Sequence, residues 1–341
     1  MVFRLIPTIL CMLICATSFA QKGGRFVEAS QDISYHFTVT SYSTNQGLPE
    51  SQVVDIVPTN GGSLLLATAD GIVSYDGHEF IEFIEDQRYK NHYPNDLLWD
   101  EYSQRLFVNE FGGNLYIFHP YYKKLQSCSA STLVNHTLYC LNEAGDLLKA
   151  DTKELVFKQT AKTGVKKAIS LHVAYPFVYI GTDTGISVYN MTTKKVSQLS
   201  NEGTITRFYT NPYNHQLFAL GIKQIYALTS KSATPSFELT VPESDAIIKD
   251  MVAVSSEEYY VSTTHGLHYI TPDYQELFRT EVLPSDNLIA LYFNEKEGCL
   301  FAGSIEKGLL RLLLKTCYSD ECTSEGGLRQ SSSTSIITTY S

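Results

Sequence analysis

Residues 64–80 read LLLATADGIVSYDGHEF and contain the pattern that decides the fold. An apolar run ends at Thr68, and a polar turn follows that closes at Gly71. A second, alternating run leads to another turn at Asp76 and Gly77. Short runs of this kind, separated by turn residues, predict two β-strands joined by a tight turn. Whether this hairpin stands alone or recurs along the chain then determines the architecture.

The hairpin pattern recurs. Clear copies are YIGTDTGISVYN at Gly185, YVSTTHGLHYIT at Gly266 and FAGSIEKGLLRL at Gly308. Weaker copies are FVNEFGGNLYIF at Gly113, YCLNEAGDLLKA at Gly145 and FALGIKQIYALT, which has Gln224 in place of the glycine. Together with the first stretch they make seven copies, about 40 residues apart, which is the period of a four-stranded propeller blade. One shorter step, at the third copy, predicts a shortened blade there.

The first and last copies indicate how the ring closes. The seventh copy contains three strand-like runs that end near Lys315, and it lacks a fourth. Residues 35–43, YHFTVTSYS, alternate apolar and polar residues upstream of the first copy. We therefore predict a single all-β domain over residues 35–315, a seven-bladed β-propeller closed by an N-terminal strand that completes the last blade. Six or eight blades are the alternatives, because the third and fifth copies are weak.

The two ends of the chain differ from the repeat. Residues 1–20 carry Arg4, an apolar run and small residues before Ala20, which is typical of a secretory signal peptide cleaved after Ala20. The alternative is an uncleaved anchor, although the apolar run is short for a bilayer. We expect a periplasmic protein without a membrane span in the mature chain. Residues 21–34 are a predicted linker, and the Ser/Thr-rich residues 316–341 are a predicted disordered tail.

Composition and charge exclude several classes of function. The formal net charge is −10 and there is no basic cluster, so nucleic acid is not an expected partner. Cys140 and Cys299 lie in apolar runs and are expected to be small buried side chains, whereas pairing of Cys317 with Cys322 stays open. We find no nucleophile elbow, phosphate loop or metal-ligand spacing. The sequence therefore predicts no catalytic residues, no metal and no cofactor.

The first blade and its leader, residues 42–80, resemble the two-component regulator propeller repeat. The leader GLP at residues 47–49 and the YDG at residues 75–77 match that family's pattern, whereas Leu65 stands where the family has a tryptophan. The resemblance implies the periplasmic sensor part of a signalling receptor, often one that senses fragments of polysaccharides. Such receptors continue with more blades, a β-sandwich, a membrane helix and an output module. The change of character after Lys315 suggests a truncated receptor rather than a free-standing propeller, and both interpretations stay open.

A ligand-binding face follows from propeller geometry. The loops between blades and the turns between second and third strands lie on one face, around the axis. The candidate ligand-binding residues on these segments are Asn45, Gln46, Ser51, Gln52, Tyr93, Asn95, Asp96, Phe111, Asp183, Arg207, His265 and Asn287. Their amides, carboxylates and aromatic rings suit a small-molecule or oligosaccharide ligand. Two alternatives remain: a scaffold that docks other periplasmic proteins, and a propeller hydrolase or lyase acting on carbohydrate.

Overall fold

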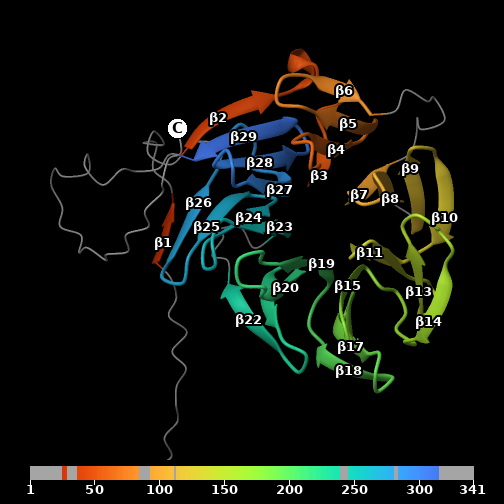
Figure 1. Ribbon diagram of the computed structural model, residues 1–341. Coiled ribbons are helices and arrows are strands. Elements are labelled where there is room, and N and C mark those ends of the chain that lie inside the picture. The colour runs from red at the N-terminus through yellow and green to blue at the C-terminus, as the bar shows by residue number, and fades with distance from the viewer. Residues whose placement is uncertain are drawn as a thin grey trace, which may run out of the picture.

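The computed structural model describes residues 25–28, 37–83, 93–110, 113–238, 245–279 and 283–314. These residues form seven sheets, antiparallel except for one added strand, that stand around a common axis like the blades of a propeller (Figure 1). The prediction of an all-β, seven-bladed propeller is confirmed, and the alternatives of six or eight blades are wrong.

Each blade is a four-stranded meander whose first strand is innermost, and we number the blades along the chain. Blade 1 consists of β3 (Val53–Pro58), β4 (Leu64–Thr68), β5 (Gly71–Tyr75) and β6 (Phe80–Glu82). Blade 2 consists of β7 (Pro94–Asp100), β8 (Arg105–Glu110), β9 (Asn114–His119) and β10 (Lys123–Ser127). Blade 3 consists of β11 (Ala130–Val134), β12 (Thr137–Leu141), β13 (Asp146–Asp151) and β14 (Lys158–Lys162). Blade 4 consists of β15 (Ser170–Ala174), β16 (Phe177–Thr182), β17 (Gly185–Asn190) and β18 (Lys195–Ser200).

The remaining three blades follow the same order. Blade 5 consists of β19 (Ile205–Thr210), β20 (Leu217–Gly221), β21 (Gln224–Leu228) and β22 (Ala233–Glu238). Blade 6 consists of β23 (Ile248–Ala253), β24 (Tyr259–Thr263), β25 (Gly266–Ile270) and β26 (Tyr274–Phe278). Blade 7 contains β27 (Leu288–Asn294), β28 (Cys299–Ser304) and β29 (Leu309–Leu314). Blade 3 keeps all four strands, so the predicted shortening is not a missing strand. The shorter spacing between the second and third copies of the repeat reflects short connections.

The hydrophobic core is divided among the interfaces between blades. Seven clusters of buried side chains are present, and each joins two neighbouring blades. At one interface, for example, Leu65 and Ile72 of blade 1 pack against Leu106 and Val108 of blade 2. Leu65 is 1% exposed there. Each sheet therefore buries apolar side chains on both faces, which explains why the second and third strands read as almost continuous apolar runs.

The glycine of the repeat is required by the turn between second and third strands. Gly185 begins β17 with φ +139°, and a Cβ atom there would lie 2.1 Å from the carbonyl oxygen of Ser200. Gly71 and Gly266 start their strands with similar positive φ values. Any L-residue would be strained at such a position. Blade 5, with Gln224, closes this turn without a positive φ at that residue.

The N-terminal strand closes the ring, as predicted. β2 (Phe37–Tyr42) pairs antiparallel with β29, from Phe37 opposite Leu314 to Tyr42 opposite Leu309. Blade 7 therefore takes one strand from the start of the chain and three from the end (Figure 1). A 3-10 helix, η2 (Thr44–Gln46), then leads from β2 to β3.

A further strand lies in the predicted linker. β1 (Arg25–Glu28) pairs parallel with β26 and adds a fifth strand to the outer edge of blade 6. The N-terminal part of the chain thus contacts two blades rather than one. This pairing covers the exposed hydrogen-bonding edge of β26.

The structure corrects the interpretation of Cys140. Cys140 in β12 forms a disulfide with Cys128, which lies just before β11, so it is not a free buried thiol. The odd number of cysteines gave no indication of this pair. Cys128 and Cys140 become neighbours because β11 and β12 pair in blade 3. Cys299 is free and buried, as expected.

Several predictions lie outside the described residues: the signal peptide at residues 1–20, the tail at 316–341 with Cys317 and Cys322, and Phe111. Within the described ranges, no helix is long and apolar enough to cross a membrane.

Candidate functional site

The innermost strands place one side chain of each blade at the same height on the inner wall of the ring. In six blades this residue lies opposite the second-to-last residue of the second strand, and in blade 3 it lies opposite the last. We call this place the ring position. From blade 1 to blade 7 it is occupied by Asp55, Asp96, Ala130, Ser170, Arg207, Asp250 and Ala290. The ring position lies near the start of each innermost strand, next to the blade-to-blade connections.

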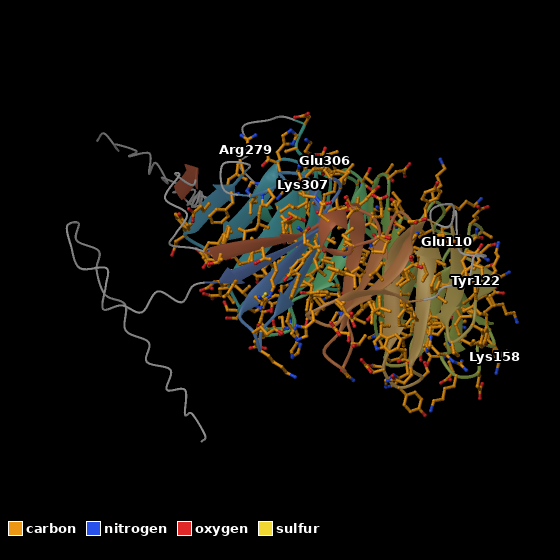
Figure 2. The ribbon with its side chains drawn as sticks, turned by 90° about the horizontal axis from the view of Figure 1, so that it is seen from above. Glu110, Tyr122, Lys158, Arg279, Glu306 and Lys307 are labelled. Carbon is orange, nitrogen blue, oxygen red and sulfur yellow. A yellow bond between two sulfur atoms is a disulfide. The ribbon has the colours of Figure 1, made fainter. Side chains whose placement is uncertain are left out.

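We call the face of the ring with these connections the upper face. It also carries the turns between second and third strands, because the meander returns to the same end of the blade after two strands. Glu306 and Lys307, in the turn between β28 and β29, lie at this face together with Arg279, which follows β26 (Figure 2).

Four charged residues at the ring position form a cluster across the axis. Arg207 Nη1 lies 3.2 Å from Asp250 Oδ1, and Arg207 Nη2 lies 3.4 Å from Asp55 Oδ1. Asp96 Oδ1 is 3.8 Å from Arg207 Nη2. One guanidinium from blade 5 therefore joins carboxylates from blades 1, 2 and 6. We call these four residues the Arg207 cluster.

Two carboxylates of the Arg207 cluster also bind the neighbouring blade. Asp55 Oδ2 accepts a hydrogen bond of 2.8 Å from the backbone N–H of Leu97. Asp250 Oδ2 accepts one of 2.8 Å from the N–H of Leu291, and its Oδ1 accepts one from the N–H of Met251. Both side chains are almost completely buried, at about 5% exposure or less. Asp55 thus joins blade 1 to blade 2, and Asp250 joins blade 6 to blade 7.

Asp96 differs from the other two carboxylates. Its side chain is 31% exposed, and its Oδ2 accepts a hydrogen bond of 3.1 Å from the side-chain amide of Asn109. Loss of hydration and the negative charge of Asp55 raise the pKa of Asp96 to about 6, against the opposing effect of Arg207. Loss of hydration also raises the pKa of Asp250, whereas the charge of Asp250 raises the pKa of Arg207.

A polar pocket opens beside Asp96. It has a volume of about 470 Å³ and is lined by residues of blades 2 to 5. Ser129, Ala130 and Ser170 form the wall on the side of blades 3 and 4, where the ring position carries small residues. The volume lies within the range of small-molecule sites in proteins.

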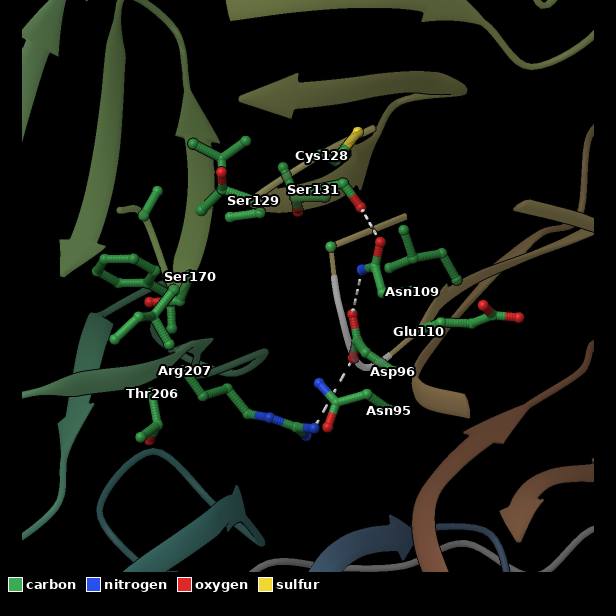
Figure 3. A pocket seen from close by; sticks show the side chains of 18 of the residues that line it. Asn95, Asp96, Asn109, Glu110, Cys128, Ser129, Ser131, Ser170, Thr206 and Arg207 are labelled. Atoms are coloured by element: carbon green, nitrogen blue, oxygen red, sulfur yellow. Dashed lines mark hydrogen bonds and ion pairs between the residues drawn. The ribbon is translucent and has the colours of Figure 1, made fainter. Parts of the chain in front are cut away.

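A chain of side-chain contacts runs along the pocket wall (Figure 3). Ser131 donates a hydrogen bond of 2.6 Å to Asn109 Oδ1, the amide of Asn109 donates to Asp96, and Asp96 faces Arg207. Cys128, held by its disulfide, lies at the same wall. These contacts fix the orientation of the polar side chains in the pocket wall.

The pocket unites three of the predicted site residues, namely Asn95, Asp96 and Arg207. The others lie elsewhere. Asn45 and Gln46 belong to η2, where Gln46 Oε1 accepts hydrogen bonds from Ser43. The carbonyl of Ser51 accepts a hydrogen bond from the N–H of Gly308.

The remaining predicted residues with described positions are also outside the pocket. Asp183 and His265 lie in turns between second and third strands, where His265 Nδ1 is 2.9 Å from the hydroxyl of Thr264. Tyr93 is largely exposed, and Asn287 Oδ1 is buried without a hydrogen-bond partner among the described residues. Gln52 is half-buried and precedes β3.

Asp55 and Asp250 are not among the predicted site residues, although they complete the Arg207 cluster. Their signal is visible in the sequence: each is a single carboxylate in an apolar first strand, two residues after Val53 or Ile248. Aligning the first strands of all blades would have placed both in register with Arg207. Within the described ranges, no three histidine, cysteine or acidic side chains gather as a metal site.

A second cavity, of about 650 Å³, lies on the side of blades 5 to 7. Tyr209, Tyr213, Tyr292 and Phe293 contribute aromatic rings to its wall. Arg207 lines both cavities, so the Arg207 cluster lies between them.

Together these features define a seven-bladed β-propeller with a polar pocket on its inner wall. No family model and no curated protein matches the chain. Among solved structures, 1466 chains match, so the fold is shared too widely to identify a function by itself.

Three of these structures illustrate the range. The extracellular domain of BT3049 from B. thetaiotaomicron, described as a hybrid two component system, is 13% identical with a TM-score of 0.66, over 81% of this chain and 42% of that one. Virginiamycin B lyase from Staphylococcus aureus is 10% identical with a TM-score of 0.64, over 82% of this chain and all of that one. YCF48 bound to D1 peptide is 10% identical with a TM-score of 0.61, over 86% of this chain and all of that one. The chain spans about two fifths of the length of the extracellular domains of hybrid two component systems that it matches. The similarity at these identities establishes the fold alone.

Proposed function

We propose that this protein is an exported sensor propeller that binds a small-molecule or oligosaccharide ligand, without catalysis, in the pocket beside Asp96. The pocket carries this proposal, because amide and hydroxyl groups of Asn95, Asn109, Asn114, Ser129 and Ser131 converge on one polar cavity. Such groups match the donors and acceptors of a sugar. The fold similarity to extracellular domains of two-component systems supports a sensor.

The disulfide supports the location. Disulfides persist in oxidising compartments such as the periplasm and are rare in the cytosol. Cys128 and Cys140 form one at the pocket wall. The disulfide is therefore consistent with a protein outside the cytoplasm, and we propose the periplasm as its compartment.

The absence of catalysis is part of the proposal and is supported by how two of the three carboxylates of the Arg207 cluster are used. Asp55 and Asp250 accept backbone hydrogen bonds and contact Arg207, so their oxygens are engaged in joining blades. A general acid or base needs a proton-transfer atom within reach of the substrate. Turnover of any ligand by the purified protein would contradict this part.

The test is a thermal-shift screen of the full chain against neutral and acidic oligosaccharides and small polar metabolites. A ligand that binds only the folded state at 100 times its Kd stabilises that state by about 2.7 kcal/mol. Ser129→Phe places a ring in the pocket and should abolish the shift. Ser197→Phe, on exposed strand β18, is the matched control and should keep it. A wild-type protein that no compound stabilises would contradict the proposal.

The scaffold alternative has one observation in its favour. Tyr102, Tyr175 and Tyr213 lie in turns between first and second strands, at the end of the blades opposite the upper face. Their exposed fractions are 55%, 80% and 37%. Exposed tyrosines are frequent in protein interfaces. Recovery of an exported protein by the wild-type chain, but not by a Tyr102→Ser and Tyr175→Ser variant, would favour docking at this face.

A further inference from the structure

The charge of the Arg207 cluster restricts the ligand that the pocket can accept. The cluster holds one guanidinium and three carboxylates, so negative charge is in excess. Both terminal nitrogens of Arg207 already face carboxylates, Nη1 that of Asp250 and Nη2 those of Asp55 and Asp96. The three carboxylates therefore already outweigh the positive charge that Arg207 could offer to an incoming anion.

The rest of the pocket does not supply a replacement cation. Of the described residues that line it, the charged ones are Asp96, Glu110 and Arg207. The other polar lining groups are amides and hydroxyls, which carry no net charge. Moving a carboxylate or a sulfate from water into this wall would cost free energy without a compensating ion pair.

Asp96 is the carboxylate that can accept hydrogen bonds from a ligand. Asp55 and Asp250 are buried and bind backbone N–H groups, whereas Asp96 lines the pocket and is 31% exposed. An ionised carboxylate has about four lone-pair sites. Asn109 occupies one of them, and Arg207 is only loosely placed at 3.8 Å. Even if Arg207 is counted as the partner of a second site, two sites remain for neighbouring hydroxyl groups of a ligand.

We propose that the pocket binds an uncharged saccharide whose hydroxyl groups donate to Asp96, and that it rejects saccharides with a carboxylate or sulfate at that end. This inference rests on the proposed function, since it names the ligand class of the same pocket. It assigns Asp96 a direct role in binding, and it assigns Asp55 and Asp250 the role of keeping the surroundings of Asp96 negative, which Arg207 offsets only in part.

The experiment uses pairs of oligosaccharides that are matched in length and linkage and differ only in charge, such as galactose and galacturonate oligomers and glucose and glucuronate oligomers. Affinities are measured by calorimetry on the full chain at pH 7.5. For each pair that binds, we expect the neutral member to bind at least about tenfold more tightly, equivalent to 1.4 kcal/mol. The same preference should shrink at high salt, because salt screens the repulsion.

Variants assign the preference to Asp96. Asp96→Asn keeps the shape of the side chain and removes its charge, so the neutral-to-acidic ratio should fall by about tenfold. Asp273→Asn removes an exposed carboxylate in the turn between β25 and β26, outside the pocket, and should leave the ratio unchanged.

The outcomes separate the inference from the proposed function. Acidic members that bind as tightly as neutral ones would overturn the inference and leave a sugar-binding sensor. A ratio that is unchanged in Asp96→Asn and at high salt would likewise overturn it. If neither neutral nor acidic saccharides bind, the inference fails, whereas the proposed function fails only if the thermal-shift screen also finds no stabilising metabolite.

Discussion

The ring position is used in two opposite ways around the inner wall. We call blades 1, 2, 5 and 6, whose ring residues are charged, the closed half, and blades 3 and 4, which border the pocket, the open half. In blades 1, 2, 5 and 6 the ring position carries a charged residue, and the four side chains meet across the axis. In blades 3, 4 and 7 it carries Ala130, Ser170 or Ala290, and the wall of blades 3 and 4 recedes into a pocket. The repeat determines where these side chains lie. Their size and charge determine whether they meet across the axis or leave room for a pocket.

The largest effect is expected from removing the cation of the closed half. Arg207→Met leaves Asp55 and Asp250 buried without their counter-charge. Breaking a buried ion pair in this way costs about 3–5 kcal/mol. Denaturant unfolding at neutral pH, with the midpoint and slope compared to wild type, measures the loss.

The matched control is Arg311→Met. Arg311 pairs with Glu297 at 3.1 Å on the outer part of blade 7, where both side chains are partly exposed. Such a pair contributes about 1 kcal/mol or less. Equal losses in both variants would show that the Arg207 cluster does not hold the closed half together.

The open half depends on its disulfide instead. The Cys128–Cys140 bond encloses a short loop at the pocket wall, and reducing it should cost about 2–3 kcal/mol. Unfolding with and without a reductant measures this loss. Cys299→Ser should show the same loss, because Cys299 is not bonded, whereas Cys128→Ser should be insensitive to the reductant. A wild-type protein that unfolds identically under both conditions would contradict the expectation.

The smallest effect concerns Asp96, which lies between the two halves. Its folded-state pKa of about 6 is above the unfolded value of 3.8, so the folded state binds more protons between these limits. The charged groups that face it are Asp55, Asp250 and Arg207. The contribution of Asp96 to stability should therefore rise as the pH falls from about 7 to about 4, by on the order of 1 kcal/mol after allowance for partial exposure.

The measurement is the difference in unfolding free energy between wild type and Asp96→Asn across this pH range. His268 changes stability in the opposite direction, because burial lowers its pKa to about 4 and its neutral form is favoured in the folded state. Taking the difference removes this contribution, since His268 is present in both proteins. A difference that does not vary with pH would contradict the raised pKa of Asp96.

Most of the fold could be predicted because a propeller repeats its local chemistry. The glycine turns and the alternating segment at 35–43 were sufficient to count seven blades and to identify the closing strand. β1 could not be found in this way, since it joins blade 6 by parallel backbone pairing at an edge, outside the repeat. The Cys128–Cys140 bond depends on which strands become neighbours, which cysteine spacing alone does not reveal.

The site could be predicted only in part. Asn95, Asp96 and Arg207 were identified because inter-blade loops and strand starts face the axis. The same argument also selected Asp183 and His265, whose turns lie at the upper face but outside the pocket. Asp55 and Asp250 were missed because a single carboxylate in an apolar strand does not reveal a role until its ion-pair partner is known. Its partner here is an arginine from a distant blade, which only the closed ring brings near.

The closing strand has a consequence for the order of folding. Phe37 emerges from the ribosome long before its partner Leu314, so β2 must wait without its native neighbours while nearly the whole domain is made. Contacts between residues so far apart in sequence slow folding, because the chain must be brought together before they stabilise it. The Arg207 cluster likewise joins blades 1, 2, 5 and 6 and cannot assemble early. We therefore expect closure of the seventh blade to be the slow, late step of folding, and the ends of the ring to be the first place where it opens.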